Sequence, residues 1–327
     1  MIESSALPAA PVLSLVVPMF NEAANLENLF ARLAEVMAAL GVEYEIVCVD
    51  DGSADDTVAG LLDHRRRDGR IKVVELSRNF GKELALTAGL HHAAGQAVVM
   101  IDADLQHPPE LIGAMLEKWR EGFEMVIAIR RGRERESPLK RLAARTFYDL
   151  FGRVSEVRLP PGAGDIRLLD RKVLDVLNAM PEHSRFLKGL YAWVGFRQTT
   201  LAYDVAPRTQ GETKFNLFRL WRLAIDGITS FTSVPLKVWT FIGMLVAGFA
   251  LLYGVLFIVK TLILGIDVPG YPSLIVAITF FSGVQLVSLG VIGEYLGRVF
   301  AEVKRRPLYV VRNAHGCHEA DDRGAKD

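Results

Sequence analysis

Short hydrophobic runs alternate with longer amphipathic stretches over the first 130 residues. Hydrophobic residues from Leu26 to Leu40 recur at helical spacing, with Asn21 as the expected N-cap, and Pro108 and Pro109 open a further helix. Five runs are short, apolar and rich in β-branched residues, as buried parallel strands are: Val12–Val17, Tyr44–Val49, Ile71–Leu76, Ala97–Ile101 and Met125–Ile129. This alternation predicts a doubly wound α/β sheet, which binds ligands at the carboxyl ends of its strands.

Two uncharged stretches near the C-terminus have the length of membrane-spanning helices. Val238–Val259 and Val268–Gly293 both exceed the roughly 20 residues that cross about 30 Å of hydrocarbon. Lys237 precedes the first stretch, and basic residues follow the second: Arg298, Lys304, Arg305 and Arg306. Since Lys and Arg concentrate in cytoplasmic flanks, both ends of this hairpin are expected in the cytoplasm. The alternative, two buried helices of a soluble core, fits the lengths and flanking charges less well.

Composition narrows the class of protein. Half of the 327 residues are hydrophobic, and the formal net charge of zero gives no reason to expect a nucleic-acid partner. Cys48 and Cys317, the two cysteines, are expected to be free thiols in a reducing compartment. Met1–Pro11 has neither a basic segment nor a long apolar core, so no cleaved signal peptide is expected and the following domain should be cytosolic.

Four polar clusters follow the first four predicted strands. Taken alone, Asp-Asp-Gly-Ser is a common turn, and a single Asp-x-Asp is weak evidence for a metal site. The carboxyl ends of parallel strands share one edge of a sheet, so the clusters are expected to converge there. They are Pro18–Glu22, Asp50–Ser53, Ser77–Lys82 and Asp102–Gln106.

These clusters suit a nucleoside diphosphate donor. A departing diphosphate gains negative charge, which a hard divalent ion with oxygen ligands, Mg²⁺ or Mn²⁺, can neutralise. Alternate residues of an extended segment share a face, so Asp104 and Gln106 are expected on the metal, with Asp102 nearer the ribose or sugar. Asp51 and Glu22 offer acceptors for ribose hydroxyls or base edges.

The order of the motifs resembles one enzyme family. The chain is similar to the family 2 glycosyltransferases with a GT-A fold, in the dolichol-phosphate mannose synthase and bactoprenol glucosyltransferase branch, through VVPMFNE, VDDGSADDT, LSRNFGKE, DADLQHPPE, GAGDIRLLDR and PRTQGETKF. The similarity covers nearly the whole chain, and DVPGYPSL and RRPLYVV look especially like the bactoprenol glucosyltransferases. His107 departs from the pattern, where the family often has aspartate. It is expected to be exposed to solvent, with a changed metal preference as the alternative.

The resemblance implies roles for particular residues. It implies metal ligation by Asp104 and Gln106, and catalytic roles for Asp102 and Asp165. It implies contacts with nucleotide or sugar by Pro18, Phe20, Glu22, Val49, Asp51 and Asp102. It also implies phosphate contacts by Arg130, Arg208 and Lys214. Asp165 stands where the family has its proposed base, but a phosphate monoester, with a second pKa of about 6, is largely a dianion at neutral pH. Orientation of the acceptor or sugar, or a structural turn, are therefore competing roles for Asp165.

The resemblance also implies an organisation and a reaction. Residues 1–214 are expected to form a cytosolic GT-A catalytic domain, 215–236 amphipathic juxtamembrane helices, 237–300 two transmembrane helices and 301–327 a cytosolic tail. The expected location is the bacterial inner membrane, with a multi-pass anchor. The expected reaction moves a hexosyl group, preferably glucose from UDP-glucose, onto undecaprenyl or another polyprenyl phosphate with inversion.

Several alternatives remain at this level. The donor could instead be GDP-mannose, a UDP-amino sugar or UDP-formamido-arabinose. A non-catalytic membrane scaffold and a flippase subunit are alternatives from other classes, which the metal-type ligands disfavour. The family also suggests a homo-oligomer, whose helices the glycines of the predicted spans would allow to pack closely.

Overall fold

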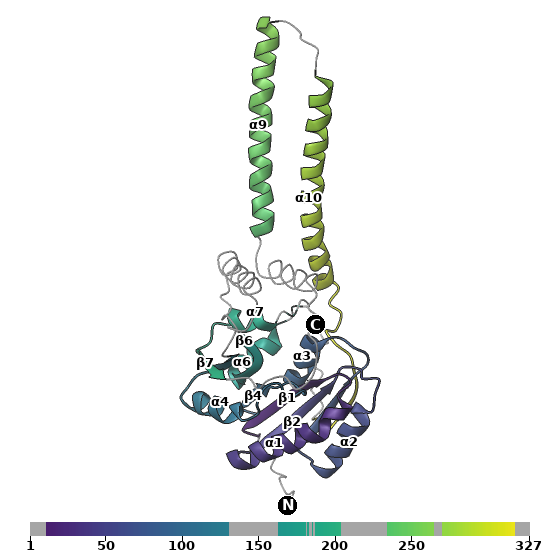
Figure 1. The fold of residues 1–327 in the computed structure, drawn as a ribbon, viewed down its shortest axis with the longest axis vertical. Helices are drawn as coiled ribbons and strands as arrows, with labels where there is room; N and C mark the ends of the chain where they lie inside the picture. The colour runs from purple at the N-terminus through teal and green to yellow at the C-terminus, as the bar shows by residue number, and fades with distance from the viewer. Residues whose placement is uncertain are drawn as a thin grey trace, which may run out of the picture. The chain divides into compact units, whose positions relative to one another are not determined.

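The computed structural model describes residues 11–130, 163–180, 182, 185, 187–203, 234–264 and 270–317. The chain divides into two compact units. The first comprises Met1–Asp149, Val157–Asn216 and Pro307–Asp327, and the second comprises Leu150–Glu156 and Leu217–Arg306. The sheet belongs to the first unit and the two long helices to the second (Figure 1).

In the described part of the chain, eight strands form one mixed sheet in the order β7-β5-β6-β4-β1-β2-β3-β8. β1 pairs in parallel with β2 and β4, β2 with β3, and β5 with β7, while β6 and β8 are antiparallel to their neighbours. The strands are Leu13–Met19, Tyr44–Asp50, Ile71–Leu76, Ala97–Met100, Met125–Arg130, Ala163–Asp170, Gln198–Tyr203 and Val311–His315. All five predicted strands are confirmed to within two residues at each end, and so is the α/β class.

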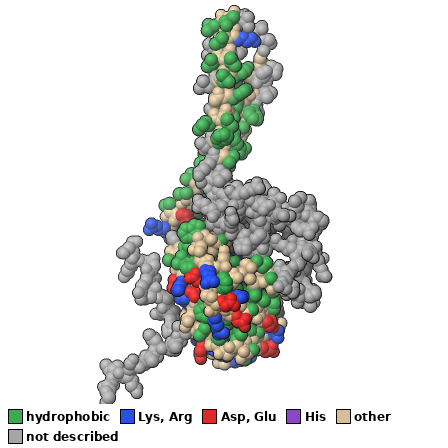
Figure 2. Space-filling model, turned by 90° about the vertical axis from the view of Figure 1, so that its left-hand side faces the viewer, with side chains coloured by type: hydrophobic (Ala, Val, Ile, Leu, Met, Phe, Trp, Pro, Cys, Tyr) green, Lys and Arg blue, Asp and Glu red, His purple; other side chains and the backbone are tan. Residues whose placement is uncertain are grey.

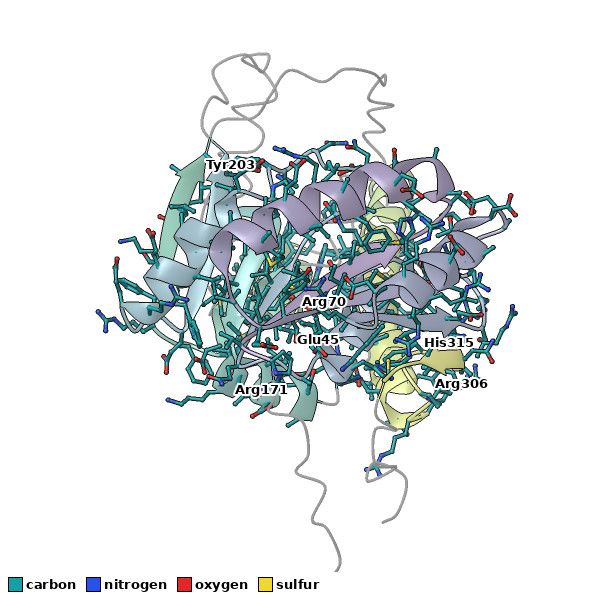
Figure 3. The ribbon with its side chains drawn as sticks, turned by 90° about the horizontal axis from the view of Figure 1, so that it is seen from below. Glu45, Arg70, Arg171, Tyr203, Arg306 and His315 are labelled. Atoms are coloured by element: carbon teal, nitrogen blue, oxygen red, sulfur yellow. The ribbon has the colours of Figure 1, made fainter. Side chains whose placement is uncertain are left out.

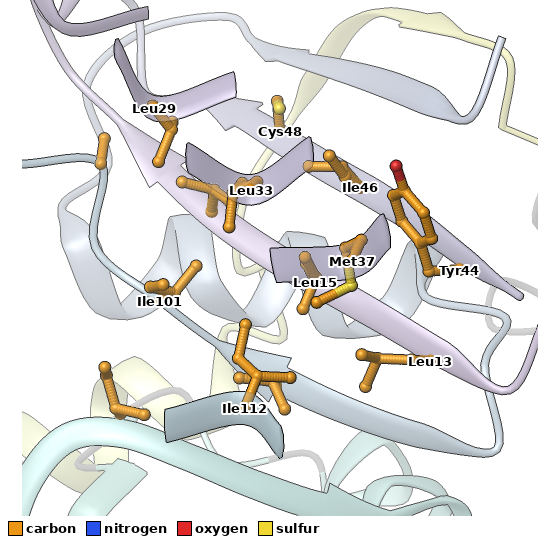
Figure 4. Packing of buried hydrophobic residues seen from close by; sticks show 14 of the residues in the cluster. Leu13, Leu15, Leu29, Leu33, Met37, Tyr44, Ile46, Cys48, Ile101 and Ile112 are labelled. Atoms are coloured by element: carbon orange, nitrogen blue, oxygen red, sulfur yellow. The ribbon is translucent and has the colours of Figure 1, made fainter. Parts of the chain in front are cut away.

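Helices cover both faces of this sheet, as the predicted doubly wound fold requires. On one face, Leu29, Leu33 and Met37 of α1 pack against the inward side chains of β1 and β2 (Figure 4). On the other, Gly89 of α3 lies against Val16, so closely that an added Cβ would overlap that side chain. The helices of this unit are α1 (Leu26–Leu40), α2 (Thr57–Arg67), α3 (Lys82–His92), α4 (Leu111–Arg120), α6 (Arg171–Ala179) and α7 (Leu187–Trp193).

Of the two predicted helix starts, the one at Pro108 and Pro109 is confirmed and the one at Asn21 is wrong. Pro108 and Pro109 lie just before α4, and their carbonyls accept its first N–H groups, from Leu111 at 3.2 Å and Ile112 at 3.0 Å. Asn21 is not the N-cap of α1, which begins at Leu26 after the short 3₁₀ helix η1 (Ala23–Asn25). A positive φ of 57° at Asn21 turns the chain there and directs this side chain to another loop.

The amino edge of the sheet is closed by a buried polar network around Glu45, labelled in Figure 3. The Glu45 carboxylate accepts hydrogen bonds from the Ser14 hydroxyl and the Ala94 N–H, both at 2.6 Å, and pairs with Lys72. Arg171, also labelled, donates to the Ala93 carbonyl at 2.9 Å. Because these polar groups bond one another, the carboxyl edge is the better candidate for a ligand site.

The chain after the long helices returns to the sheet, which the sequence analysis did not predict. β8 (Val311–His315) pairs with β3, and His315 Nε2 lies 2.8 Å from Glu75 Oε1 (His315 is labelled in Figure 3). Just before β8, the Tyr309 hydroxyl lies 2.7 Å from Nδ1 of His91, a half-buried residue of α3. Part of the predicted tail is therefore an edge strand of the domain.

The environment of His91 makes stability depend on pH. Burial, together with the charges of Arg185 and His92, lowers the pKa of His91 to about 4. The folded-state pKa of His91 lies below the unfolded value of about 6.5. The contribution of neutral His91 to the stability of the fold is therefore fully present above about pH 6.5 and is lost as the pH falls toward 4. We expect the melting temperature of the full-length protein to fall over this window, and to fall less in His91→Gln. His92→Gln is the matched control on the same helix, and equal pH profiles for wild type and His91→Gln would contradict the prediction.

The second unit contains two long helices, α9 (Val234–Leu264, 31 residues) and α10 (Tyr271–Val303, 33 residues). Hydrophobic side chains cover much of their surface in Figure 2. Within the described residues, the segment Phe280–Val303 is long and apolar enough to cross a membrane, and none of it is buried. The predicted spans coincide largely with α9 and α10, and a crossing by both remains a prediction. The predicted juxtamembrane helices, residues 215–236, lie almost entirely outside the described residues.

Candidate functional site

Four neighbouring strands bring the predicted clusters to one edge of the sheet. β4, β1, β2 and β3 are adjacent and parallel, so their carboxyl ends point the same way. Pro18 and Val49 are register partners at this edge, and the Asp51 N–H donates to the Met19 carbonyl at 2.8 Å. The convergence of the polar clusters at one edge, which the sequence analysis expected from the parallel strands, is confirmed.

The loops after β1 and β2 are joined by hydrogen bonds. The Ser53 hydroxyl accepts from the Asn21 N–H at 2.9 Å, and Asn21 Oδ1 accepts from the Ala54 N–H at 2.8 Å. The Thr57 hydroxyl accepts from the Glu22 N–H at 2.9 Å. These contacts fix the position of Glu22, one of the predicted nucleotide contacts, relative to the second cluster.

Asp51 joins the second cluster to the third. Its side chain is buried, and its two carboxylate oxygens accept from the backbone N–H groups of Phe80 at 2.7 Å and Gly81 at 2.9 Å. Burial raises the pKa of Asp51, while these two hydrogen bonds act in the opposite direction. Asp51 therefore positions the loop after β3, and a contact from Asp51 to the nucleotide remains a prediction.

Gly52 makes the same junction tight. Its φ of +74° is in the left-handed region, and an added Cβ would lie 2.6 Å from the backbone C of Arg78 and 2.7 Å from the backbone N of Asn79. The Asp50 carboxylate closes this turn by accepting from the N–H groups of Gly52 and Ser53. Only glycine both adopts this backbone conformation readily and allows the two loops to approach so closely.

The fourth cluster does not have the expected extended geometry. Ala103 and Asp104 form a turn, Leu105 has a φ of +51°, and the Gln106 N–H donates back to Asp104 Oδ1 at 3.1 Å. The inference that Asp102, Asp104 and Gln106 share one face of an extended segment is therefore wrong, because the chain reverses between them. Asp104 and Gln106 are nevertheless both exposed.

Asp102 has a partner that the sequence analysis missed. The Lys82 ammonium lies 2.7 Å from Asp102 Oδ1, joining the start of α3 to the end of β4. Lys82 ends the third cluster, yet it was given no role. Its place directly after a predicted strand-end loop, opposite two aspartates, was the signal that could have identified it.

His107 is half-buried, and the expectation that it is exposed is wrong. Its Nδ1 lies 2.5 Å from the hydroxyl of the buried Tyr203, the last residue of β7, and the two rings meet edge to face at 5.6 Å. Tyr203 is labelled in Figure 3. The loop that carries Asp104 and Gln106 is thus held to the end of β7.

The other predicted residues fall into three groups. Phe20 is 46% exposed beside the site, whereas the Val49 side chain is fully buried, so a nucleotide contact by Val49 is left to its backbone. Arg130 ends β5 and Asp165 lies in β6, where pairing of Met100 with Arg167 brings the start of β6 to the carboxyl edge. Arg208 and Lys214 lie outside the described residues.

The residues present fit a divalent ion that arrives with its substrate. Within the described ranges, no three His, Cys, Asp or Glu side chains are arranged as a metal site. Asp102, Asp104 and Gln106 offer hard oxygen atoms, and Mg²⁺ commonly uses one or two carboxylates together with substrate phosphates in place of a complete protein cage. Asp104 and Gln106 are accessible for such binding.

Comparison with known proteins identifies the family. A mannosyltransferase of Pyrobaculum calidifontis, solved with GDP-Man and Mn²⁺, is 22% identical with a TM-score of 0.43, covering 66% of this chain and 61% of that one. An uncharacterized glycosyltransferase of Synechocystis sp. is 55% identical over 304 residues, 93% of this chain and 96% of the relative. The bactoprenol glucosyl transferase of Shigella phage SfII is 44% identical, over 93% of this chain and 98% of the relative. Residues 14–177 match the sequence profile of glycosyl transferase family 2, and the chain belongs to this family.

Proposed function

We propose that the chain transfers a glucosyl group from UDP-glucose to undecaprenyl phosphate with inversion at the anomeric carbon. The observation that carries this proposal is its likeness, over 98% of their length, to relatives named bactoprenol glucosyl transferase. The polar carboxyl edge of the sheet supports it with exposed oxygen ligands at Asp104 and Gln106. The coarser conclusion, a glycosyltransferase, follows from the family itself.

The proposed reaction is a direct displacement. An oxygen of the acceptor phosphate forms a bond to the anomeric carbon as the bond to the donor diphosphate breaks, and UDP leaves with the electron pair. Because the acceptor is largely a dianion at neutral pH, no proton has to be removed before attack. Asp165, on β6 near the carboxyl edge, is therefore proposed to orient the acceptor or the sugar, with a base as its alternative role.

Metal ligands and basic side chains are proposed to stabilise the negative charge of the donor and acceptor phosphates. A divalent ion held by Asp104 and Gln106, Mg²⁺ or Mn²⁺, supplies positive charge to the leaving diphosphate when it is bound. Arg130, Arg208 and Lys214 are proposed to offset the repulsion between donor and acceptor phosphates. Pro18, Phe20, Glu22, Val49, Asp51 and Asp102 keep their proposed contacts with nucleotide or sugar.

The lipid acceptor requires a membrane location. We propose that α9 and α10 cross the bacterial inner membrane, with both flanks and the catalytic domain in the cytoplasm. The exposed, apolar Phe280–Val303 segment supports this, and so do Lys304, Arg305 and Arg306 directly after it. A homo-oligomer remains part of the proposal.

A panel of labelled nucleotide sugars tests the function. The purified full-length protein is incubated with undecaprenyl phosphate and each donor in Mg²⁺, Mn²⁺ or EDTA, and the organic phase is counted. We expect a lipid-linked product from UDP-glucose that EDTA abolishes. A product from another donor alone would show that the transferred sugar is not glucose. A product that forms in EDTA would show that the reaction needs no divalent ion. No product from any donor would overturn the enzymatic proposal in favour of a scaffold.

A further inference from the structure

Lys82 and Asp102 connect two loops of the site through an ion pair of 2.7 Å. Lys82 is the first residue of α3, and Asp102 lies two residues after β4. The side chains are 44% and 21% exposed, so both reach the space at the carboxyl edge. The ion pair places an ammonium directly against a carboxylate that is proposed to contact the nucleotide or sugar, two residues before the proposed metal ligand Asp104.

The described loops of this edge contain few cations. In the described loops after β1, β2, β3 and β4 and the first turn of α3, Arg78 and Lys82 are the only lysine or arginine residues. The Arg78 guanidinium stacks 4.0 Å from the centre of the Phe80 ring and donates to the Asn79 carbonyl at 3.0 Å. Arg78 is thus held by its own loop. Of these two cations, Lys82 is the one that contacts the fourth polar cluster, through Asp102, where a diphosphate is proposed to bind.

We propose that Lys82 is a donor-responsive cation that exchanges one anion for another. Before the donor binds, its ammonium neutralises Asp102. When a nucleoside diphosphate enters with its divalent ion, the ammonium leaves this carboxylate and binds a diphosphate oxygen. This inference rests on the proposed function, which supplies the diphosphate.

Three physical reasons favour the exchange. A divalent ion at Asp104 and Gln106 brings positive charge close to Asp102, so its approach weakens the hold of Asp102 on the Lys82 ammonium. A partly exposed ion pair contributes little stability, so breaking it costs little. The flexible four-carbon stem of lysine lets the ammonium move while α3 stays in place, and the N-terminal end of α3 itself favours an anion.

Opposite changes in two affinities provide the test. The full-length protein in detergent is titrated with Mn²⁺ alone, followed by electron paramagnetic resonance, and with UDP at saturating Mn²⁺, followed by calorimetry. In Lys82→Met, we expect Mn²⁺ alone to bind a few-fold more tightly, because the repulsion between the ammonium and the ion is gone. UDP should bind about tenfold more weakly, because a charged hydrogen bond is lost. Lys82→Arg should recover most of the UDP affinity.

A matched variant and three outcomes make the test decisive. Lys118→Met removes the same charge from a partly exposed ion pair between Lys118 of α4 and Glu121, which directly follows that helix, and should change neither affinity. Unchanged UDP affinity in Lys82→Met would overturn the proposal. So would a parallel fall of both affinities with a lower melting temperature, because that pattern indicates a structural role. If the wild-type protein shows no Mn²⁺-dependent UDP binding, the proposed function falls as well.

Discussion

Replacing Asp104 with asparagine is expected to reduce glycosyl transfer by at least about a hundredfold while leaving the fold intact. Asp104 is exposed, and its one described hydrogen bond is the one that Oδ1 accepts from the Gln106 N–H. An asparagine side chain can accept the same hydrogen bond, so the turn is preserved. What disappears is the negative charge that would hold a divalent ion against the leaving diphosphate.

Transfer of labelled glucose and the melting temperature should be measured together for this variant. Asp63→Asn changes a partly exposed aspartate on α2 that pairs with Arg67; it is the matched control and should behave as wild type in both measurements. Full activity in Asp104→Asn would remove Asp104 from the proposed metal site. A large fall in melting temperature would instead assign it a structural role.

Replacing Gly52 with alanine is expected to lower the free energy of unfolding by about 3 kcal/mol and to weaken donor binding. Of this, about 1–2 kcal/mol comes from placing a side chain at positive φ, and the rest from overlap of the new Cβ with backbone atoms. The overlapping atoms belong to Arg78 and Asn79, so they cannot move away as a flexible side chain would. Moving them also disturbs the loop that Asp51 holds through Phe80 and Gly81.

Two other glycines separate these contributions in denaturant unfolding experiments. Gly41 has a φ of +59° and no atom within 4 Å of an added Cβ, so Gly41→Ala should show the backbone cost alone. Gly69 has neither a positive φ nor a close neighbour, and Gly69→Ala should be nearly neutral. Equal losses in Gly52→Ala and Gly41→Ala would show that the close approach of the two loops has no energetic weight.

The hydrophobic pattern was sufficient to predict the first five of the eight described strands. β4 is buried along its whole length and is a continuous apolar run, and the buried strand β2 is apolar from Ile46 to Val49, so both segments can be recognised from the sequence. The order β4-β1-β2-β3 then brings the four predicted clusters together. β8 has the opposite character, because its three central residues are exposed and three of its five residues, Arg312, Asn313 and His315, are polar. Its place is decided by the free edge of β3, more than 200 residues earlier in the chain.

The sequence by itself determined the fold class, the family and the edge at which the polar clusters gather, because each depends on local periodicity or on motifs in order. Only the tertiary structure decided which side chains meet at that edge. Lys82 contacts Asp102, His107 contacts Tyr203, and Leu105 turns the chain with a positive φ. These features lie in loops that connect or contact strands far apart in the sequence. In such loops, packing and hydrogen bonding override the alternation of side chains expected of an extended segment.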